Sequence, residues 1–132
     1  MELQLNQTAI GAFLGRPSER LSGRIMRDFS IYMEFVSPCD QIFSFSKPAT
    51  LIIKDSAGKI SFTVDKSLGD SKYKLYANQP VFLHYEFFLE EKEWLALLNG
   101  KVALMNIRDE YYDISTIIPQ LIADERFVDD AQ

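Results

Sequence analysis

The chain has 132 residues, of which 47% are hydrophobic and 25% are charged, and its formal net charge is −5. This size and composition suit one folded domain over residues 1–132 and exclude a disordered chain. No apolar run approaches the roughly 20 residues that span a bilayer, the N-terminus lacks a secretory signal pattern, and Cys39 is the single cysteine, so we expect a cytoplasmic protein that does not bind membranes.

The N-terminal quarter contains a first ambiguous segment and then a clear strand. Residues 2–14 fit either a short helix or a first strand. Residues 17–23 predict a turn or a short helix, because Gly23 counts against a longer one. A strand is predicted from about 24 to 36, where apolar and other side chains alternate with a period of two: Phe29, Ile31, Met33 and Phe35.

The middle of the chain consists of short β-patterned runs separated by turn residues. Short strands are predicted at 42–45, 51–53, 60–64 and 73–77. The loop at 54–59 joins two of them as a hairpin, with Gly58 available for positive φ. Residues 81–89 are apolar at nearly every position, which predicts a central strand covered on both faces.

In the C-terminal third, the spacing of apolar residues changes from the period of a strand to that of a helix. Acidic residues followed by Trp94, Leu97 and Leu98 predict a helix over about 90–98, with Gly100 in the left-handed conformation after it. A strand at 102–107, a turn, an extended pair at 111–112 and a last helix from Ser115 or Thr116 follow, and 127–132 form a frayed acidic tail. The fold class is therefore α+β: an antiparallel, strongly curled sheet or small β-barrel of five to seven strands, with two short helices in the C-terminal half.

The residue types that carry most catalytic and metal chemistry are scarce. One cysteine and one histidine cannot build a zinc site, and no carboxylate loop has calcium-binding spacing, so we expect no metal and no cofactor. His84 shares a strand face with Glu86, which could orient the imidazole ring. Between flanking phenylalanines, however, a partly buried structural histidine is the favoured interpretation. An enzyme is therefore the third-ranked hypothesis, and it would use His84.

Four arginines cluster near the start of the predicted strand: Arg16, Arg20, Arg24 and Arg27. Arg16 and Arg20, followed by Asp28 and Ser30, resemble the signature of PilZ domains, small β-barrels that bind cyclic di-GMP. The resemblance covers residues 16–33 and departs at Met33, where the family has glycine, and in the seven residues between Arg20 and Asp28, where the family has a whole strand. Guanidinium groups match phosphate well, but residues 1–36 hold four acids as well as four arginines, which favours neutralising ion pairs.

The acidity of the chain belongs to its last third. Residues 79–132 carry four basic and eleven acidic side chains. This balance makes direct contact with nucleic acid an unfavourable hypothesis and suits a basic protein partner.

The favoured function is therefore a non-enzymatic binding protein of the inhibitor, immunity, adaptor or accessory-chaperone type. The oligomeric state stays open. The alternative is a PilZ-like regulatory barrel that holds an anionic small molecule or nucleotide at the arginine cluster. The predicted contact residues for the favoured function are Glu90, Glu91, Glu93, Asp109, Glu110 and Asp113.

Overall fold

The chain folds into two antiparallel sheets and a short two-stranded extension, with helix at one end. The computed structural model describes residues 3–19, 23–44, 49–66 and 72–121. The strands are β1 (Gln4–Leu14), β2 (Ser18–Glu19), β3 (Ile25–Val36), β4 (Gln41–Ser44), β5 (Ala49–Lys54), β6 (Ile60–Lys66), β7 (Lys72–Leu75), β8 (Pro80–Glu90), β9 (Val102–Ile107) and β10 (Glu110–Asp113). The helix α1 spans Glu91–Leu98.

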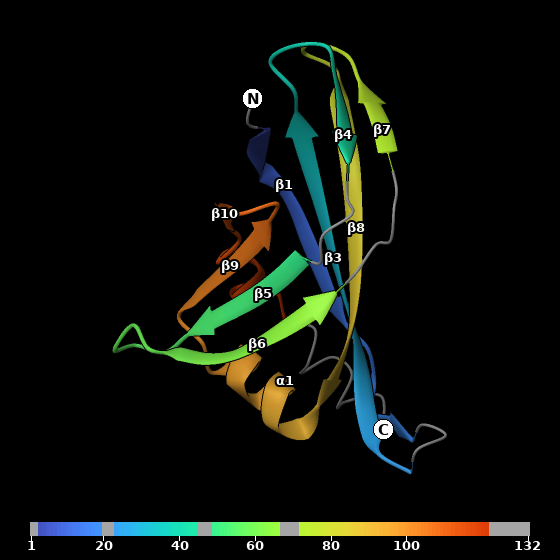
Figure 1. Cartoon of the computed structure of the whole chain (residues 1–132). Helices are drawn as coiled ribbons and strands as arrows, with labels where there is room; N and C mark the ends of the chain where they lie inside the picture. The colour runs from blue at the N-terminus through green and yellow to red at the C-terminus, as the bar shows by residue number, and fades with distance from the viewer. Residues whose placement is uncertain (1–2, 20–22, 45–48, 67–71, 122–132) are drawn as a thin grey trace.

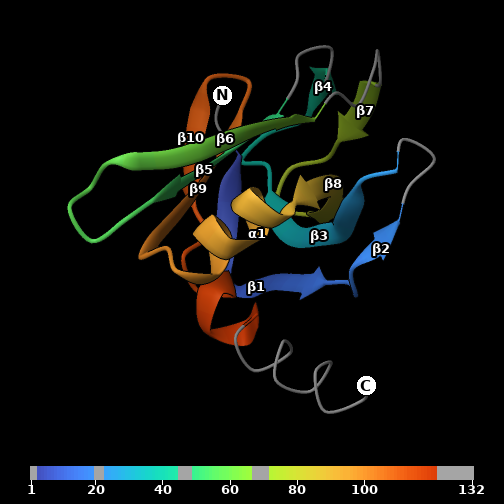
Figure 2. The same ribbon diagram turned by 90° about the horizontal axis from the view of Figure 1, so that it is seen from below.

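The first sheet, here called the long sheet, is centred on β3. Strand β8 pairs with one edge of β3, and β1 and β2 pair with the other. The second, here called the short sheet, has the strand order β10-β9-β5-β6. The strands of the short sheet cross those of the long sheet obliquely, so that the two sheets form two layers (Figures 1 and 2).

The strands β4 and β7 continue the β3–β8 pair as one ribbon. Val36 faces Pro80 and Gln41 faces Leu75, so the register advances equally on both sides of the interruption. At the interruption the backbone N–H of Asn78 donates to the carbonyl of Ser37 at 2.8 Å, and the N–H of Ala77 donates to Asp40 Oδ1 at 2.8 Å. The β5–β6 hairpin is inserted between β4 and β7 and supplies half of the short sheet.

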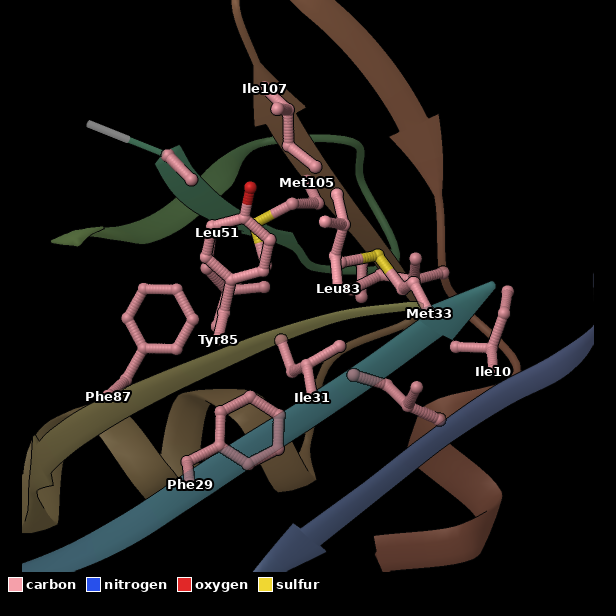
Figure 3. Close-up of a cluster of buried hydrophobic side chains, with 14 of the residues drawn as sticks. Ile10, Phe29, Ile31, Met33, Leu51, Leu83, Tyr85, Phe87, Met105 and Ile107 are labelled. Atoms are coloured by element: carbon pink, nitrogen blue, oxygen red, sulfur yellow. The ribbon is translucent and has the colours of Figure 1, made fainter. Parts of the chain in front are cut away.

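The core lies between the two sheets. In Figure 3 the side chains of Phe29, Ile31 and Tyr85 on the long sheet point toward Leu51 and Met105 on the short sheet. All five are at most 1% exposed. Burial of large apolar side chains such as these is the main source of stability in a small domain. A helical segment at 117–121 adds three more buried apolar residues, Ile117, Ile118 and Leu121.

Helix α1 begins where the sequence predicts. Glu93 Oε1 accepts a hydrogen bond of 2.8 Å from the backbone N–H of Glu90, which satisfies one donor at the helix start. Trp94 and Leu97 are its buried residues. Gly100 is not in the left-handed conformation: among the described glycines only Gly23 and Gly58 have positive φ. A Cβ on Gly100 would lie 2.5 Å from Ile53 Cγ2, so close packing against β5 is what favours glycine there.

The antiparallel α+β architecture with two short helices is confirmed. No sheet in the described part of the chain closes on itself or curls strongly, so the predicted small barrel is not confirmed. The ambiguous segment at 2–14 is the strand β1, and Gly58 has the expected positive φ of 83°. The described residues form ten strands instead of five to seven, because the ribbon is interrupted and β2 and β10 are short. The predicted tail at 127–132 and Arg20 lie outside the described residues.

Candidate functional site

The outer face of the long sheet is the most distinctive surface of the described molecule. Along β3 and β8 the odd-numbered side chains point into the core, and the even-numbered ones point to the opposite face. The prediction that residues 81–89 are covered on both faces is wrong, because Phe82 on this outer face is 73% exposed. Strand β8 pairs with β3 alone among the described strands, so it is not central either.

Exposed aromatic rings occupy neighbouring positions on this face. Besides Phe82, Phe13 on β1 is 53% exposed and Tyr32 on β3 is 50% exposed. In the register Phe13 faces Ser30, Tyr32 faces His84, and Glu34 faces Phe82. We call this surface the outer aromatic face and define it by Phe13, Tyr32, Glu34, Phe82, His84 and Glu86. Contiguous exposed apolar surface on a protein marks an interaction site more often than isolated exposed residues do.

Tyr32 and His84 stack on each other across β3 and β8. Their ring centroids are 4.5 Å apart, and the ring planes are tilted by only 3°. This separation is close to the spacing between neighbouring strands, so each ring stands upright on its own strand. The stack fixes the orientation of both rings without any hydrogen bond to His84 from the described residues.

The outer aromatic face carries negative charge and no positive charge. The even-numbered positions of β3 and β8 include Asp28, Glu34, Glu86 and Glu90, and none of them is Lys or Arg. Glu34 accepts a hydrogen bond from Asn6 Nδ2 on the β1 side of the sheet. Glu86 has no hydrogen-bond or ion-pair partner among the described residues. The face therefore combines aromatic rings with carboxylates, a pairing that attracts cations.

Gly11 leaves an open position on this face next to Tyr32. It is the β1 residue that faces Tyr32, on the side opposite His84. A Cβ built on Gly11 would have no atom of the described chain within 4 Å. Because His84 covers one face of the Tyr32 ring, the other ring face is turned toward β1 and this open position.

The six predicted acidic contact residues do not gather on one surface. Glu90, Glu91 and Glu93 lie at the junction of β8 and α1, whereas Asp109 and Glu110 lie at the β9–β10 turn. The helix and this turn stand at opposite ends of β9 (Figure 1), a strand of six residues that spans about 20 Å. Asp113 ends β10 and faces Leu104 in the middle of β9.

Several of these carboxylates already have local structural partners. Glu90 forms an ion pair with Arg24, and Glu93 accepts the N–H of Glu90 at the start of α1. Asp113 Oδ1 accepts hydrogen bonds from the backbone N–H and the hydroxyl of Ser115, at 2.9 and 2.6 Å. Among the six, Glu91 is exposed, and its side chain makes no hydrogen bond or ion pair with the described residues.

The described members of the arginine cluster point in different directions. Arg16 is exposed in the turn after β1, and Arg24 pairs with Glu90. Arg27 is only 2% exposed on the core side of β3, where its guanidinium lies 5.4 Å from the centroid of the Trp94 ring. Its Nε donates a hydrogen bond of 2.6 Å to the carbonyl of Gly15. Within the described residues, these three arginines do not converge on a common anion site.

The groups with possible catalytic roles are separated. His84 lies on the outer aromatic face, and Cys39 lies in the interruption of the ribbon, where its carbonyl accepts a hydrogen bond of 2.5 Å from Ser37 Oγ. The described ranges contain no group of three His, Cys, Asp or Glu side chains placed to hold a metal ion. The described helices include none with the length and apolarity that crossing a membrane requires.

The comparisons with known proteins give no family assignment: no protein-family model, no curated protein and no solved structure matches the chain. The site must therefore be argued from its residues. Sequence reasoning did not select Phe13, Tyr32 or Phe82. Tyr32 and Phe82 could have been found from the acidic residues Asp28, Glu34 and Glu86, which share the even-numbered register of β3 and β8 with these two rings and so mark that register as the solvent side.

Proposed function

We propose that this protein is a non-enzymatic binding protein that contacts a protein partner through the outer aromatic face. The observation that carries the proposal is the exposure of Phe82, Tyr32 and Phe13 on one face of a sheet whose opposite face packs into the core over most of its length. Aromatic side chains in neighbouring positions supply large contact area at low entropic cost and are enriched in protein interfaces. The carboxylates on the same face favour a basic partner over an acidic one.

Two further features support contact rather than catalysis. His84 is stacked on Tyr32, and no carboxylate of the described residues makes a hydrogen bond to its ring, so these residues do not form the carboxylate–imidazole pair that commonly supports acid–base catalysis. The face is part of a regular sheet built from long strands, which presents side chains on a rigid support. The same proposal places the protein in the cytoplasm, where a lone thiol such as Cys39 stays reduced.

Site-specific photocrosslinking tests the proposal. A photoreactive phenylalanine analogue replaces Phe82 in one version of the protein and Tyr111 in the other. Tyr111 is the matched control, because it is 62% exposed on β10, and Tyr112 beside it packs against Phe35 on the core side. We expect one protein to be crosslinked from position 82 and not from position 111. Crosslinks to a second copy of this chain alone, or equal crosslinking from both positions, would contradict the proposal.

The acidic residues of the last third provide rival contact sites, which the same assay can distinguish from the outer aromatic face. Charge reversal at Glu91 and Glu110 leaves the outer aromatic face unchanged. If the partner uses that face, these variants retain crosslinking from position 82. Loss of crosslinking on charge reversal would instead favour contact through the acidic residues of the last third.

A further inference from the structure

We propose that the outer aromatic face holds an arginine side chain of the partner, with its guanidinium stacked on Tyr32 over Gly11. This inference rests on the proposed function and names the chemistry of that contact. It starts from the Tyr32–His84 stack, whose second ring face is turned toward β1. We call the open position over Gly11, beside that ring face, the Gly11 slot.

The dimensions of the Gly11 slot suit a planar group. Neighbouring strands in a sheet are about 4.8 Å apart, which is close to the separation of stacked planar groups. On the β8 side, this spacing is occupied by the His84 ring, at 4.5 Å from Tyr32. On the β1 side, the corresponding residue is Gly11, and a Cβ there would meet nothing within 4 Å. A flat group entering from solvent would thus complete a three-layer stack with Tyr32 in the middle.

The surrounding charge selects a cation. Glu34 leans toward β1, as its hydrogen bond with Asn6 shows, and so stands on the same side of Tyr32 as the slot. Glu86 adds a second carboxylate on the face, and no Lys or Arg lies at an even-numbered position of β3 or β8. Guanidinium is both planar and cationic, stacks on aromatic rings and pairs with carboxylates through several N–H donors, whereas a lysine ammonium is not planar. A nucleobase is also flat, but the phosphates of the nucleic acid that carries it would be repelled by these carboxylates.

A titration of the full ¹⁵N-labelled chain with small probes tests the inference. The probes are N-acetyl-arginine methylamide, the citrulline analogue that keeps the shape without the charge, the lysine analogue, and a thymidine oligonucleotide. We expect the arginine probe to shift amide signals of residues 10–12 and 30–34, with a dissociation constant on the order of tens of millimolar for a single side chain. Citrulline should bind at least about threefold more weakly. Equal shifts from citrulline and arginine, or binding of the oligonucleotide at these residues, would overturn the inference.

A variant that fills the slot separates binding from folding. Gly11→Val places a β-branched side chain in the open position, where no clash is expected and strand propensity improves. We expect the arginine probe to bind at least about fivefold more weakly to Gly11→Val, with no loss of thermal stability. The matched control is Thr63→Val, an exposed substitution on β6 in the short sheet, which should leave binding unchanged. Unchanged binding to Gly11→Val would contradict the inference.

Two further variants test whether the carboxylates of the outer aromatic face contribute to arginine binding. Glu34→Gln combined with Glu86→Gln keeps shape and hydrogen bonding while it removes two charges, and should weaken the arginine probe about threefold. Glu91→Gln on α1 removes an exposed charge elsewhere and should have no effect.

The two proposals can fail separately. Partner crosslinking from position 82 without an arginine response would retain the proposed function and discard the slot. Binding of the arginine probe without any crosslinked partner would retain the Gly11 slot as a guanidinium site and discard the proposed function.

Discussion

The two faces of the long sheet are built from the same strands but are opposite in character. On β3 the inner side chains Phe29, Ile31 and Phe35 are fully buried, whereas Tyr32 between them is half exposed. On β8, Tyr85 and Phe87 are buried, and Phe82 is the most exposed of the large hydrophobic residues that the structure describes. Both faces are aromatic, so composition alone does not distinguish core from surface. The distinction lies in the residues that share each register.

Acidic side chains distinguish the exposed outer face from the buried inner face. The inner register of β3 and β8 holds one charged residue, Arg27, which is covered by Trp94 and hydrogen-bonded to Gly15. The outer register holds Asp28, Glu34, Glu86 and Glu90. Turning these four carboxylates into the apolar core would cost far more than exposing several aromatic rings, so the acids determine which face meets water. The exposed rings are then available for recognition, not for folding.

The largest effect is expected from truncation on the inner face. Phe35 is fully buried, and its ring meets Tyr112 edge-on at 4.9 Å, so it links the long sheet to β10. Phe35→Ala should lower the free energy of unfolding by about 3–5 kcal/mol, because it leaves a cavity between the two sheets. Urea denaturation followed by circular dichroism measures the loss. A loss below about 1 kcal/mol would mean that the two sheets do not depend on this contact.

Arg27 should give the next largest effect, since it is the exception on the inner face. Arg27→Ala removes the hydrogen bond to Gly15 and uncovers Trp94, and should cost about 2–3 kcal/mol. Trp94 is the single tryptophan, so its fluorescence reports the site directly, and we expect a red shift. Arg24→Ala, which breaks an exposed ion pair with Glu90, is the control and should cost about 0.5 kcal/mol or less. Equal losses in the two variants would refute the structural role assigned to Arg27.

Two glycines show the same contrast between packed and open surroundings, because Gly100 lies in the core and Gly11 lies on the outer face. Gly100 packs against Ile53, and a methyl group there would require β5 or the end of α1 to shift. We expect Gly100→Ala to lower stability by about 1–3 kcal/mol. Gly11→Ala, on the outer face, should be neutral or stabilising by up to about 1 kcal/mol, because it reduces the entropy of the unfolded chain without a clash. Thermal unfolding of both variants measures whether Gly100→Ala lowers stability while Gly11→Ala leaves it unchanged or raises it.

Much of the fold follows from local patterns in the sequence. Period-two alternation locates β3 and β6, a long apolar run locates β8, and the acidic cluster before Trp94 locates α1. Pairing between distant strands does not follow in this way. The insertion of the β5–β6 hairpin into the β3–β8 ribbon places β5 next to β9 across about fifty residues of chain, and no short-range signal encodes that contact.

The candidate site was harder to predict than the fold. A run such as residues 81–89, apolar on both faces, is typical of a covered strand, and only the tertiary arrangement shows that the described residues leave one face exposed. The acidic residues of the last third belong to separate elements and partly serve as helix and turn caps, so their nearness in sequence does not make a surface. The arginines form a cluster in sequence, but alternation along the chain and burial of Arg27 separate those that the structure describes.

The smallest effect on stability is expected from the residue most exposed on the outer face. Phe82 contributes little buried area, so Phe82→Ser should change the free energy of unfolding by no more than about 0.5 kcal/mol in either direction. The same change should remove most of the contact with the partner, since truncation of a central aromatic residue in an interface commonly costs about 2 kcal/mol or more of binding free energy. Tyr111→Ser serves as the control for both measurements. A Phe82→Ser protein that unfolds much more easily would show that the ring belongs to the core of the folded state, and the contrast between the two faces would then lose its functional meaning.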